Sequence, residues 1–182
     1  DIPHAFEGYE AVINSPDVDI VYVALPITHH AQWTIAAAQA GKHVLVEKSF
    51  AMNEAEAQAM LAAGRENGVR IVEALHHRYH PAFARFLDVF GSGDLGEIEE
   101  VDAEFSLELP VDQGLIQRNP ELGGGAMRDL GCYPLHWLQS VDPTSIAHLE
   151  VEVAKAASGV DETVSGQLRF ASGVVGRFRT SI

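Results

Sequence analysis

A charged pair stands directly behind an apolar run in the first half of the sequence. Glu47 and Lys48 follow His43–Val46, whose apolar and β-branched residues predict a buried strand. Ligands of open α/β sheets bind at the carboxyl ends of the strands, so a lysine at this point can present its positive charge to a hydroxyl or carbonyl oxygen. A surface ion pair at the end of a strand would explain the two residues equally well.

A second group of candidate residues lies on a helix predicted over Ala126–Val141. Asp129, Tyr133 and His136 are spaced i, i+4 and i+7, so they can share one face of that helix. A phenol with a reference pKa of about 10 needs a nearby cation to act as an acid or base near neutral pH, and Lys48 is the obvious candidate.

Two histidine-rich stretches, His29–His30 and His76–His80, raise the question of a metal site. Adjacent histidines on a strand point to opposite faces, and metal sites combine spaced ligands with carboxylates or thiols, so we expect no metal here. His76 or His77 is better suited to line a pocket, because both follow the end of a strand. Arg118 could contact a substrate, or it could be a solvated loop residue.

Gly91–Gly96 matches the dinucleotide-binding pattern G-x-G-x-x-G letter for letter. That motif works where it follows a strand and opens a helix, because the helix N-terminus must meet the pyrophosphate. Here a predicted helix precedes the glycines and a strand-like run follows them, so we expect a plain connecting loop. A second run, Gly123–Gly125, lacks the spacing of a phosphate loop.

The elements that would position these residues change in kind near residue 75. Before it, apolar strand-like runs alternate with helices that end at glycine. This order predicts right-handed crossovers and an α/β fold, the second half of a Rossmann-type parallel sheet domain over residues 1–74, with strands buried on both faces. The expected strands are 20–25, 43–46 and 69–73, and the expected helices are 9–14, 30–40 and 53–67, the last with Asn53 and Glu56 as a capping box.

From residue 75 to 182 the pattern is that of an α+β domain with a mostly antiparallel sheet. Helices are expected over 81–90 and 126–141, and Pro134 is expected to kink the second one. Alternating apolar residues predict strands at about 98–109, 146–157, 163–170 and 174–181, with a turn at Ala171–Gly173 between the last two.

The composition excludes several classes of protein. A formal net charge of −14 would repel nucleic-acid phosphates and an anionic membrane surface. The single cysteine, Cys132, excludes an internal disulfide and fits a reducing compartment. No apolar run approaches the ~18–20 residues of a membrane helix and no signal peptide is visible, so we expect a soluble cytoplasmic protein.

Several segments, in order along the chain, resemble motifs of the glucose–fructose oxidoreductase / inositol dehydrogenase (Gfo/Idh/MocA) family. Leu25–His30 and Ala40–Lys48 resemble the family pattern (T/L)PNxxH … AGKHVxxEKP. Glu73–Ala74 followed by Arg78–Pro81 resembles the junction into the family's second domain, and Gly123–Tyr133 resembles its GGGxxxDxGxY helix. Agreement of several motifs in the right order is far stronger evidence than any one of them.

The resemblance implies a Rossmann cofactor domain followed by a sheet domain that supplies the substrate pocket and oligomer contacts. It implies hydride transfer between NAD or NADP and a sugar, polyol or related carbinol. Lys48 matches the family's active-site lysine, Asp129 its helix aspartate and Tyr133 its acid/base position. We hypothesise that Tyr133 transfers the proton, Lys48 supplies a polarising charge and Asp129 orients them. Tyrosine there is typical of the glucose–fructose oxidoreductase, xylose dehydrogenase and dihydrodiol dehydrogenase branch.

The resemblance also implies the binding residues and the assembly. A homo-oligomer without a metal is expected, and for His136 a supporting or core position is favoured over a direct role. The expected cofactor-binding residues are Leu25, Pro26, His30, Glu47, Lys48 and Glu73, and the expected substrate residues are His77, Arg118 and His136.

Two departures from the family pattern leave alternatives open. Ile27 replaces the usual Asn and Ser49 the usual Pro, both near the cofactor, so a non-catalytic sugar- or nucleotide-binding sensor of the same family is the first alternative. A metal-dependent hydrolase that uses the histidine-rich stretch is the second. We also expect a fragment that lacks the N-terminal dinucleotide-binding motif and the residue that selects NAD or NADP, and that is inactive by itself.

Overall fold

The computed structural model describes residues 4–110 and 114–182. Contacts within the chain divide it into two compact units, unit 1 (Asp1–Ala74) and unit 2 (Leu75–Ile182).

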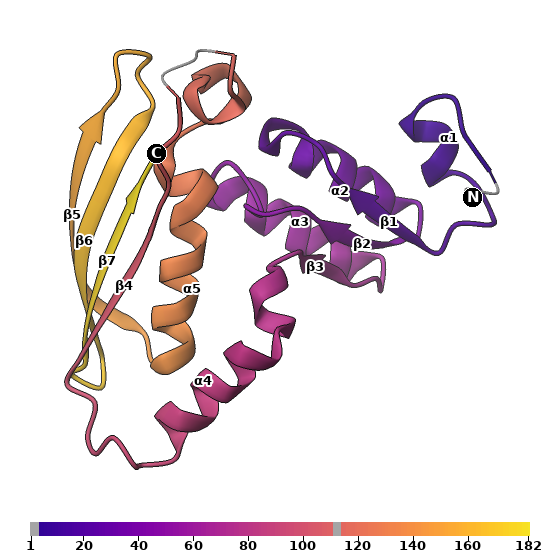
Figure 1. Cartoon of the computed structure of the whole chain (residues 1–182). Coiled ribbons are helices and arrows are strands. Elements are labelled where there is room, and N and C mark those ends of the chain that lie inside the picture. The colour runs from indigo at the N-terminus through magenta and orange to yellow at the C-terminus, as the bar shows by residue number, and fades with distance from the viewer. Residues whose placement is uncertain (1–3, 111–113) are drawn as a thin grey trace. The chain divides into compact units, whose positions relative to one another are not determined.

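Unit 1 is built on a three-stranded parallel sheet in the order β1-β2-β3 (Figure 1). In this sheet Val23 lies opposite Val46, and Val46 lies opposite Glu73, so the carboxyl ends of all three strands meet at one edge. The elements of unit 1 are α1 (Tyr9–Ile13), β1 (Ile20–Val23), η1 (Ile27–His29), α2 (His30–Gln39), β2 (His43–Val46), α3 (Glu54–Glu66) and β3 (Ile71–Glu73).

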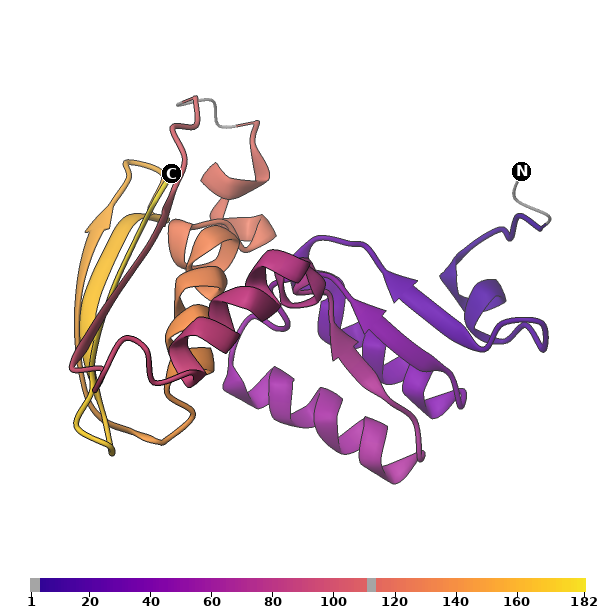
Figure 2. The same ribbon diagram turned by 60° about the horizontal axis from the view of Figure 1, so that its bottom comes forward.

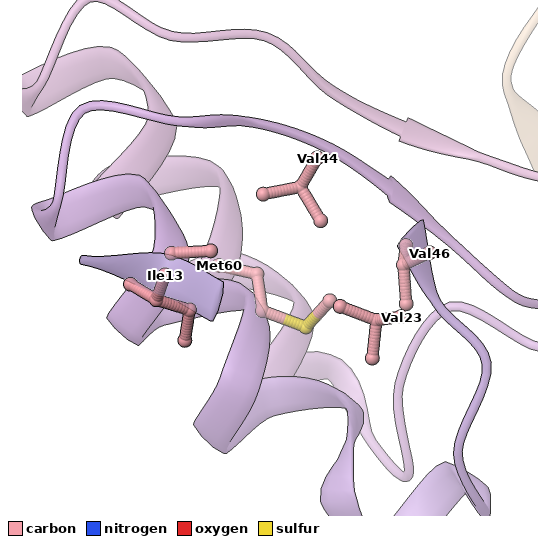
Figure 3. Packing of buried hydrophobic residues seen from close by; sticks show 6 residues of the cluster. Ile13, Val23, Val44, Val46 and Met60 are labelled. Carbon is pink, nitrogen blue, oxygen red and sulfur yellow. The ribbon is translucent and has the colours of Figure 1, made fainter. Parts of the chain in front are cut away.

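Helices α2 and α3 cover one face of this sheet (Figure 2). Both connect a strand to its parallel neighbour, and right-handed crossovers that advance in the same direction place their helices on the same side. Val23, Val44 and Val46 point toward them and pack with Met60 of α3 and with Ile13 (Figure 3). The alternation of apolar residues along each strand therefore builds the core of unit 1.

The opposite face of the same sheet is exposed in the described part of the chain. Its residues are Ile20, Tyr22, Leu45 and Val72, each between 36% and 63% exposed. The prediction that the strands are buried on both faces is therefore wrong for the described residues. The physical reason is that both crossover helices lie on one side.

Local sequence signals set the helix ends of unit 1. The backbone N–H of Glu56 donates to Oδ1 of Asn53 at 3.0 Å, which confirms Asn53 as the N-cap of α3. The Glu56 carboxylate accepts from the N–H of Met52 at 3.1 Å, so the capping box closes one residue earlier than predicted. Gly41 and Gly68 follow α2 and α3 with φ of 77° and 66°, values that favour glycine.

Unit 2 contains a four-stranded sheet in the order β4-β7-β6-β5 (Figure 1). β4 runs parallel to β7, whereas the other two pairs are antiparallel, which confirms a mostly antiparallel sheet. The elements of unit 2 are η2 (His76–Tyr79), α4 (Pro81–Gly91), β4 (Glu100–Ser106), η3 (Ile116–Arg118), η4 (Pro120–Leu122), η5 (Met127–Gly131), α5 (Cys132–Val141), β5 (Ile146–Lys155), β6 (Asp161–Phe170) and β7 (Val175–Ser181).

Helix α5 packs across one face of this sheet (Figures 1 and 2). Leu138 of α5 is fully buried against Leu168 and Phe178, and Gly176 leaves room for it, because a Cβ there would lie 3.2 Å from the Leu138 side chain. The other face carries charged residues, among them Arg177, which pairs with Glu100. Strict alternation on β4, β6 and β7 thus separates an apolar face from a charged one.

The helix predicted over 126–141 is not regular throughout. It begins with η5, a π-helical segment whose hydrogen bonds span five residues instead of four, so one residue is added to the turn. Asp129 lies inside η5 and Tyr133 lies beyond it, so the plain i, i+4 offset of an α-helix does not apply to them. Pro134 then falls in the first turn of α5, where a missing N–H is tolerated.

The dinucleotide-like motif Gly91–Gly96 ends α4 and leads toward β4. Gly93 and Gly96 have φ of 81° and 74°. The motif is therefore the connecting loop that its context predicts. No helix within residues 4–110 and 114–182 is both long and apolar enough to cross a bilayer.

Candidate functional site

The carboxyl edge of the sheet in unit 1 gathers the residues predicted to bind a cofactor. Leu25 and Pro26 follow β1, Glu47 and Lys48 follow β2, and Glu73 closes β3. Parallel strands bring these positions to one edge, as the order of the elements predicts.

His30 opens α2 behind this edge and is almost fully buried, with 1% exposure. Its Nε2 lies 2.8 Å from the carbonyl oxygen of Leu25 and its Nδ1 lies 2.9 Å from that of Ser49. A neutral imidazole can donate to one of these carbonyls, and the doubly protonated ring can donate to both. The ring thus joins the loop after β1 to the loop after β2.

Glu47 is held by neighbours on two sides. Its carboxylate accepts a short hydrogen bond from the Tyr22 hydroxyl and a second from the backbone N–H of Lys48 at 3.1 Å. The hydrogen bond to Glu47 raises the pKa of Tyr22. The Lys48–Ser49 peptide bond that follows is cis.

Glu73 stands at the end of β3 in a partly desolvated position. Burial raises the pKa of its carboxyl group, although the Phe50 N–H, His30 and Lys48 act in the opposite direction. The carboxylate therefore lies in the field of two candidate cofactor residues, and its hydrogen bond to the Phe50 N–H ties β3 to the loop after β2.

In unit 2, Tyr133 is buried among other rings. It lies on α5 with 7% exposure, and the centroids of His76, His77 and Phe105 lie 5.7, 5.3 and 5.1 Å from that of Tyr133. Trp137, one turn along α5, is 6.4 Å away. Of the predicted residues, the structure of unit 2 therefore brings Tyr133 and His77 together.

His77 and His136 form a hydrogen-bonded pair beside this group. The His77 Nε2 lies 2.9 Å from the His136 Nδ1. Burial lowers the pKa of His77 to about 4, helped by the neighbouring His136 and His76, and burial also lowers the pKa of His136. At neutral pH both rings are thus uncharged, one donating and the other accepting.

His77 also lines a groove of about 540 Å³ between α4, α5 and β4. The buried Nδ1 of His77 has no hydrogen-bond partner. The His77 side chain is thus placed to line a pocket, as predicted. Apolar side chains dominate the groove, namely Ala82, Phe83, Phe86, Phe90, Val101, Ala103 and Trp137. His76 and His77 lie in the 3₁₀ turn η2, after the end of β3 as predicted.

The glycine run before η5 is required by close contacts. A Cβ on Gly124 would lie 2.5 Å from the carbonyl oxygen of Ile116, and one on Gly125 would lie 2.1 Å from the Asp161 carboxylate. That carboxylate accepts the N–H of Met127 at 2.6 Å. A protein side chain therefore already occupies the helix N-terminus, the place where a phosphate would bind.

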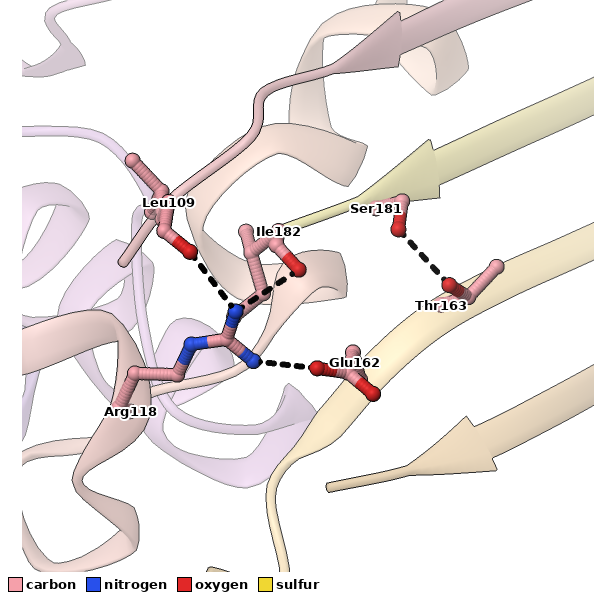
Figure 4. Close-up of polar contacts among 6 residues, drawn as sticks. All are labelled: Leu109, Arg118, Glu162, Thr163, Ser181 and Ile182. Atoms are coloured by element: carbon pink, nitrogen blue, oxygen red, sulfur yellow. Dashed lines mark hydrogen bonds and ion pairs between the residues drawn. The ribbon is translucent and has the colours of Figure 1, made fainter. Parts of the chain in front are cut away.

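Arg118, predicted to contact substrate or solvent, is 5% exposed. Its guanidinium donates to Glu162 Oε1 at 2.7 Å and to the carbonyl oxygens of Leu109 and Ile182 at 3.2 and 3.0 Å (Figure 4). These contacts give the side chain a structural role that links η3, β6 and the chain after β7. A solvated loop arginine, the alternative weighed from the sequence, does not describe it.

Four residues that contact the predicted site residues or the glycine run were not predicted from the sequence, namely Tyr22, Phe105, Trp137 and Asp161. Phe105 and Trp137 could have been found, since the alternation of β4 and the i+4 spacing from Tyr133 place both toward the helix–sheet contact. Tyr22 and Asp161 act on residues far away in the sequence, and no local pattern signals such contacts. Among the described residues no three His, Cys, Asp or Glu side chains form a group that could hold a metal ion.

Two family models match the chain, one to each unit. Residues 1–75 match the oxidoreductase family with an NAD-binding Rossmann fold, and residues 83–182 match the GFO/IDH/MocA C-terminal domain. A D-xylose 1-dehydrogenase (NADP(+)) of Haloferax volcanii is 34% identical over 99% of this chain and 55% of its own length.

Solved structures are similar over nearly the whole chain. An aldose-aldose oxidoreductase from Caulobacter crescentus complexed with glycerol has a TM-score of 0.88 and 28% identity over 95% of this chain and 53% of its own. A 3-ketoreductase from Actinomadura kijaniata in complex with NADP and TDP-benzene has a TM-score of 0.84 and 32% identity over 97% and 55%. The chain thus spans about half the length of the relatives it matches.

Proposed function

Because the chain belongs to the Gfo/Idh/MocA family of NAD-binding oxidoreductases, we propose that the complete protein transfers a hydride between NAD or NADP and a CH–OH carbon of a sugar, polyol or related carbinol. The observation that carries this proposal is the match of both units, in order, to the cofactor-binding and C-terminal domains of one family. Two of the relatives named above are a D-xylose dehydrogenase that uses NADP(+) and an aldose-aldose oxidoreductase, and the 3-ketoreductase was solved in complex with NADP.

The residues at the carboxyl edge of unit 1 fit the nicotinamide half of such a cofactor. The carboxylates of Glu47 and Glu73 can accept hydrogen bonds from ribose hydroxyls, and the Lys48 ammonium can donate to an oxygen. The described glycine runs do not fit the pyrophosphate, since Gly91–Gly96 joins a helix to a strand and Asp161 occupies the helix N-terminus behind the other run. We propose that the cofactor site comprises Leu25, Pro26, His30, Glu47, Lys48 and Glu73.

We propose that Tyr133 transfers the proton, with the help of Lys48 and Asp129. When bound, the nicotinamide accepts or supplies the hydride. In the oxidation, the phenolate oxygen of Tyr133 takes the proton of the substrate hydroxyl and becomes a hydroxyl group, and in the reduction this hydroxyl returns the proton to the substrate oxygen. Lys48 supplies the positive charge that favours the phenolate, and Asp129 orients the hydroxyl. Ring packing that limits water around Tyr133 would keep this charge effect strong.

We propose that His77 and His136, which lie near Tyr133, contact the substrate. His77 and His136 are uncharged near neutral pH, so they can exchange hydrogen bonds with sugar hydroxyls without attracting anions. Arg118 stays a predicted substrate residue, but its three internal hydrogen bonds favour a structural role.

Spectrophotometry of the complete protein tests the proposal. With NAD⁺ or NADP⁺ and a panel of sugars and polyols, we expect absorbance of the reduced nicotinamide to appear. Tyr133→Phe and Lys48→Ala should each lower kcat by ~10²-fold or more, with folding judged from circular dichroism. The matched controls are Tyr79→Phe and Lys155→Ala, at an exposed tyrosine and an exposed lysine, which should keep normal rates. Near-normal turnover in either test variant would contradict the assignment.

A non-catalytic sensor of the same family is the second candidate. Ile27 and Ser49, which replace the Asn and Pro of the family pattern beside the cofactor residues, are the observation that favours it. In that case NAD(P) binds, as measured by calorimetry, and no member of the sugar panel is turned over.

We also propose a cytoplasmic homo-oligomer that has neither a nucleic-acid nor a membrane partner. The net charge of −14 and the single cysteine support the cellular part of this proposal. The exposed face of the sheet in unit 2, with its salt bridges from Arg177 and Arg179 to β4, offers a broad surface for self-association. Light scattering of the complete protein would give the number of subunits, and a monomer at micromolar concentration would contradict it.

A further inference from the structure

The contacts of His30 show how this residue could serve the proposed cofactor site. Both of its ring nitrogens lie within 2.9 Å of main-chain carbonyl oxygens, those of Leu25 and Ser49. The side chain is 1% exposed, so the ring has no surface left to present to a ligand. Direct contact between this ring and a nicotinamide cofactor would require breaking at least one of these two contacts.

The two carbonyls belong to the loops that leave neighbouring strands. The β1–β2 ladder ends with the pair Val23 and Val46, followed by one bond from the N–H of Glu47 to the carbonyl of Val23 at 3.0 Å. Leu25 and Ser49 lie beyond this point, where the ladder no longer satisfies their carbonyls. His30 reaches both from α2, and it thereby cross-links the two loops where the ladder stops.

The loop after β2 is held from its other side as well. Phe50, the residue after Ser49, donates its backbone N–H to the Glu73 carboxylate at the end of β3. The segment Lys48–Phe50 is thus tied to β1 through His30 and to β3 through Glu73. Lys48 is the first residue of this segment, so its backbone position depends on both ties.

We infer that His30 is a positioning residue of the nicotinamide site, which fixes the Leu25 loop and the Lys48–Phe50 loop against each other and does not touch the cofactor. The inference rests on the proposed function for the identity of the ligand. It predicts that the loops are ordered by the protein itself, before any cofactor binds. Misplacement of a catalytic group by about 1 Å can lower a rate ~10²-fold, so the contacts of His30 with the two loops matter for turnover.

The test uses the complete protein with His30→Ala and His30→Gln, the latter retaining one amide donor. Hydrogen exchange is measured by mass spectrometry without cofactor, together with KM for NAD⁺ and NADP⁺. His29→Ala is the matched control, because His29 is the exposed neighbour of His30 on the chain. Exchange in β6 of unit 2 reports whether each variant is folded.

We expect exchange to rise at least ~10-fold in residues 24–29 and 47–52 of His30→Ala, with a smaller rise in His30→Gln and none in His29→Ala. KM should rise ~10-fold or more for both cofactors alike, whereas a loss of folded enzyme alone would lower only kcat. Unchanged exchange with a raised KM would mean that His30 touches the cofactor, and would overturn the inference. Raised exchange throughout unit 1 would overturn it too, since His30 would then be an ordinary core residue.

The two proposals fail in different ways. If the wild-type protein binds no nicotinamide cofactor, the proposed function fails, while the exchange of the two loops still decides whether His30 braces them. If the cofactor binds and the loops exchange equally in wild type and variants, only the role of His30 is refuted.

Discussion

Replacing Arg118 with methionine separates its structural role from the substrate contact suggested by the sequence. Methionine keeps most of the length of the side chain but removes all of its donors. The carbonyl oxygens of Leu109 and Ile182 then lose hydrogen bonds of 3.2 and 3.0 Å, and Glu162 loses its partner at 2.7 Å.

The expected loss of stability follows from the burial of each partner. An acceptor left without a donor in a buried place costs ~1 kcal/mol or more, and two carbonyls are affected. Glu162 is 41% exposed, so its ion pair adds only about 1 kcal/mol. The sum is about 3 kcal/mol, which lowers the midpoint of urea unfolding by about 1–3 M, since the free energy of unfolding typically falls by about 1–3 kcal/mol per molar urea.

The assay follows unit 2 alone. In the complete protein, Trp33 and every other tryptophan except Trp137 of α5 are replaced with phenylalanine, so the fluorescence of Trp137 reports the unfolding of unit 2. Arg85→Met, at an exposed arginine of α4, is the control and should change stability by less than about 0.5 kcal/mol. If Arg118→Met is as stable as wild type but kcat/KM for the sugar collapses, the structural reasoning is refuted and the substrate contact is right.

Three further perturbations test the description of the fold. The depressed pKa of His77 means that the unfolded chain binds this proton more tightly than the folded protein does. Stability should therefore be lost as the pH falls from about 6.5 to about 4, by no more than ~1–2 kcal/mol because the side chain is partly exposed. Urea titrations at several pH values measure this loss, and His77→Phe should flatten the dependence of stability on pH. Gly124→Ala should destabilise unit 2 by ~2 kcal/mol or more, since the Cβ would meet three backbone carbonyl oxygens, whereas Gly91→Ala, where a Cβ meets nothing, should be neutral or slightly stabilising; thermal melts compare the two. Asn53→Ala should cost unit 1 about 1 kcal/mol through loss of the α3 cap. The fluorescence of Trp33 measures it in a background where every other tryptophan is replaced with phenylalanine, and an unchanged midpoint would contradict the cap.

Most of the fold could be predicted from the sequence because its signals are local and regular. His43–Val46 is a strand with the predicted bounds, and Asn53 caps α3, since alternation and capping depend on residues only a few positions apart. The mostly antiparallel sheet of unit 2 followed from alternation over 146–181 in the same way.

The details of the candidate site depend on contacts that no local pattern encodes. The π-helical turn at Asp129 arises where the glycine run meets Asp161, a residue far along the chain. Arg118 looked like a loop arginine because its partner Glu162 comes from a distant strand. His30 was predicted at the cofactor site from its motif, but its two carbonyl partners become visible only when β1 and β2 are side by side.

The parallel pairing of β4 with β7 governs the order in which unit 2 can fold. β5, β6 and β7 form a meander of neighbouring hairpins, whose loops are short and close quickly. β4 must wait for β7, because residues 107–174, more than half of unit 2, lie between the two strands and the closure entropy of that loop has to be overcome. Phe105 sits on β4 against the Tyr133 ring, so the surroundings of the proposed acid/base residue are completed only in this last, slow step.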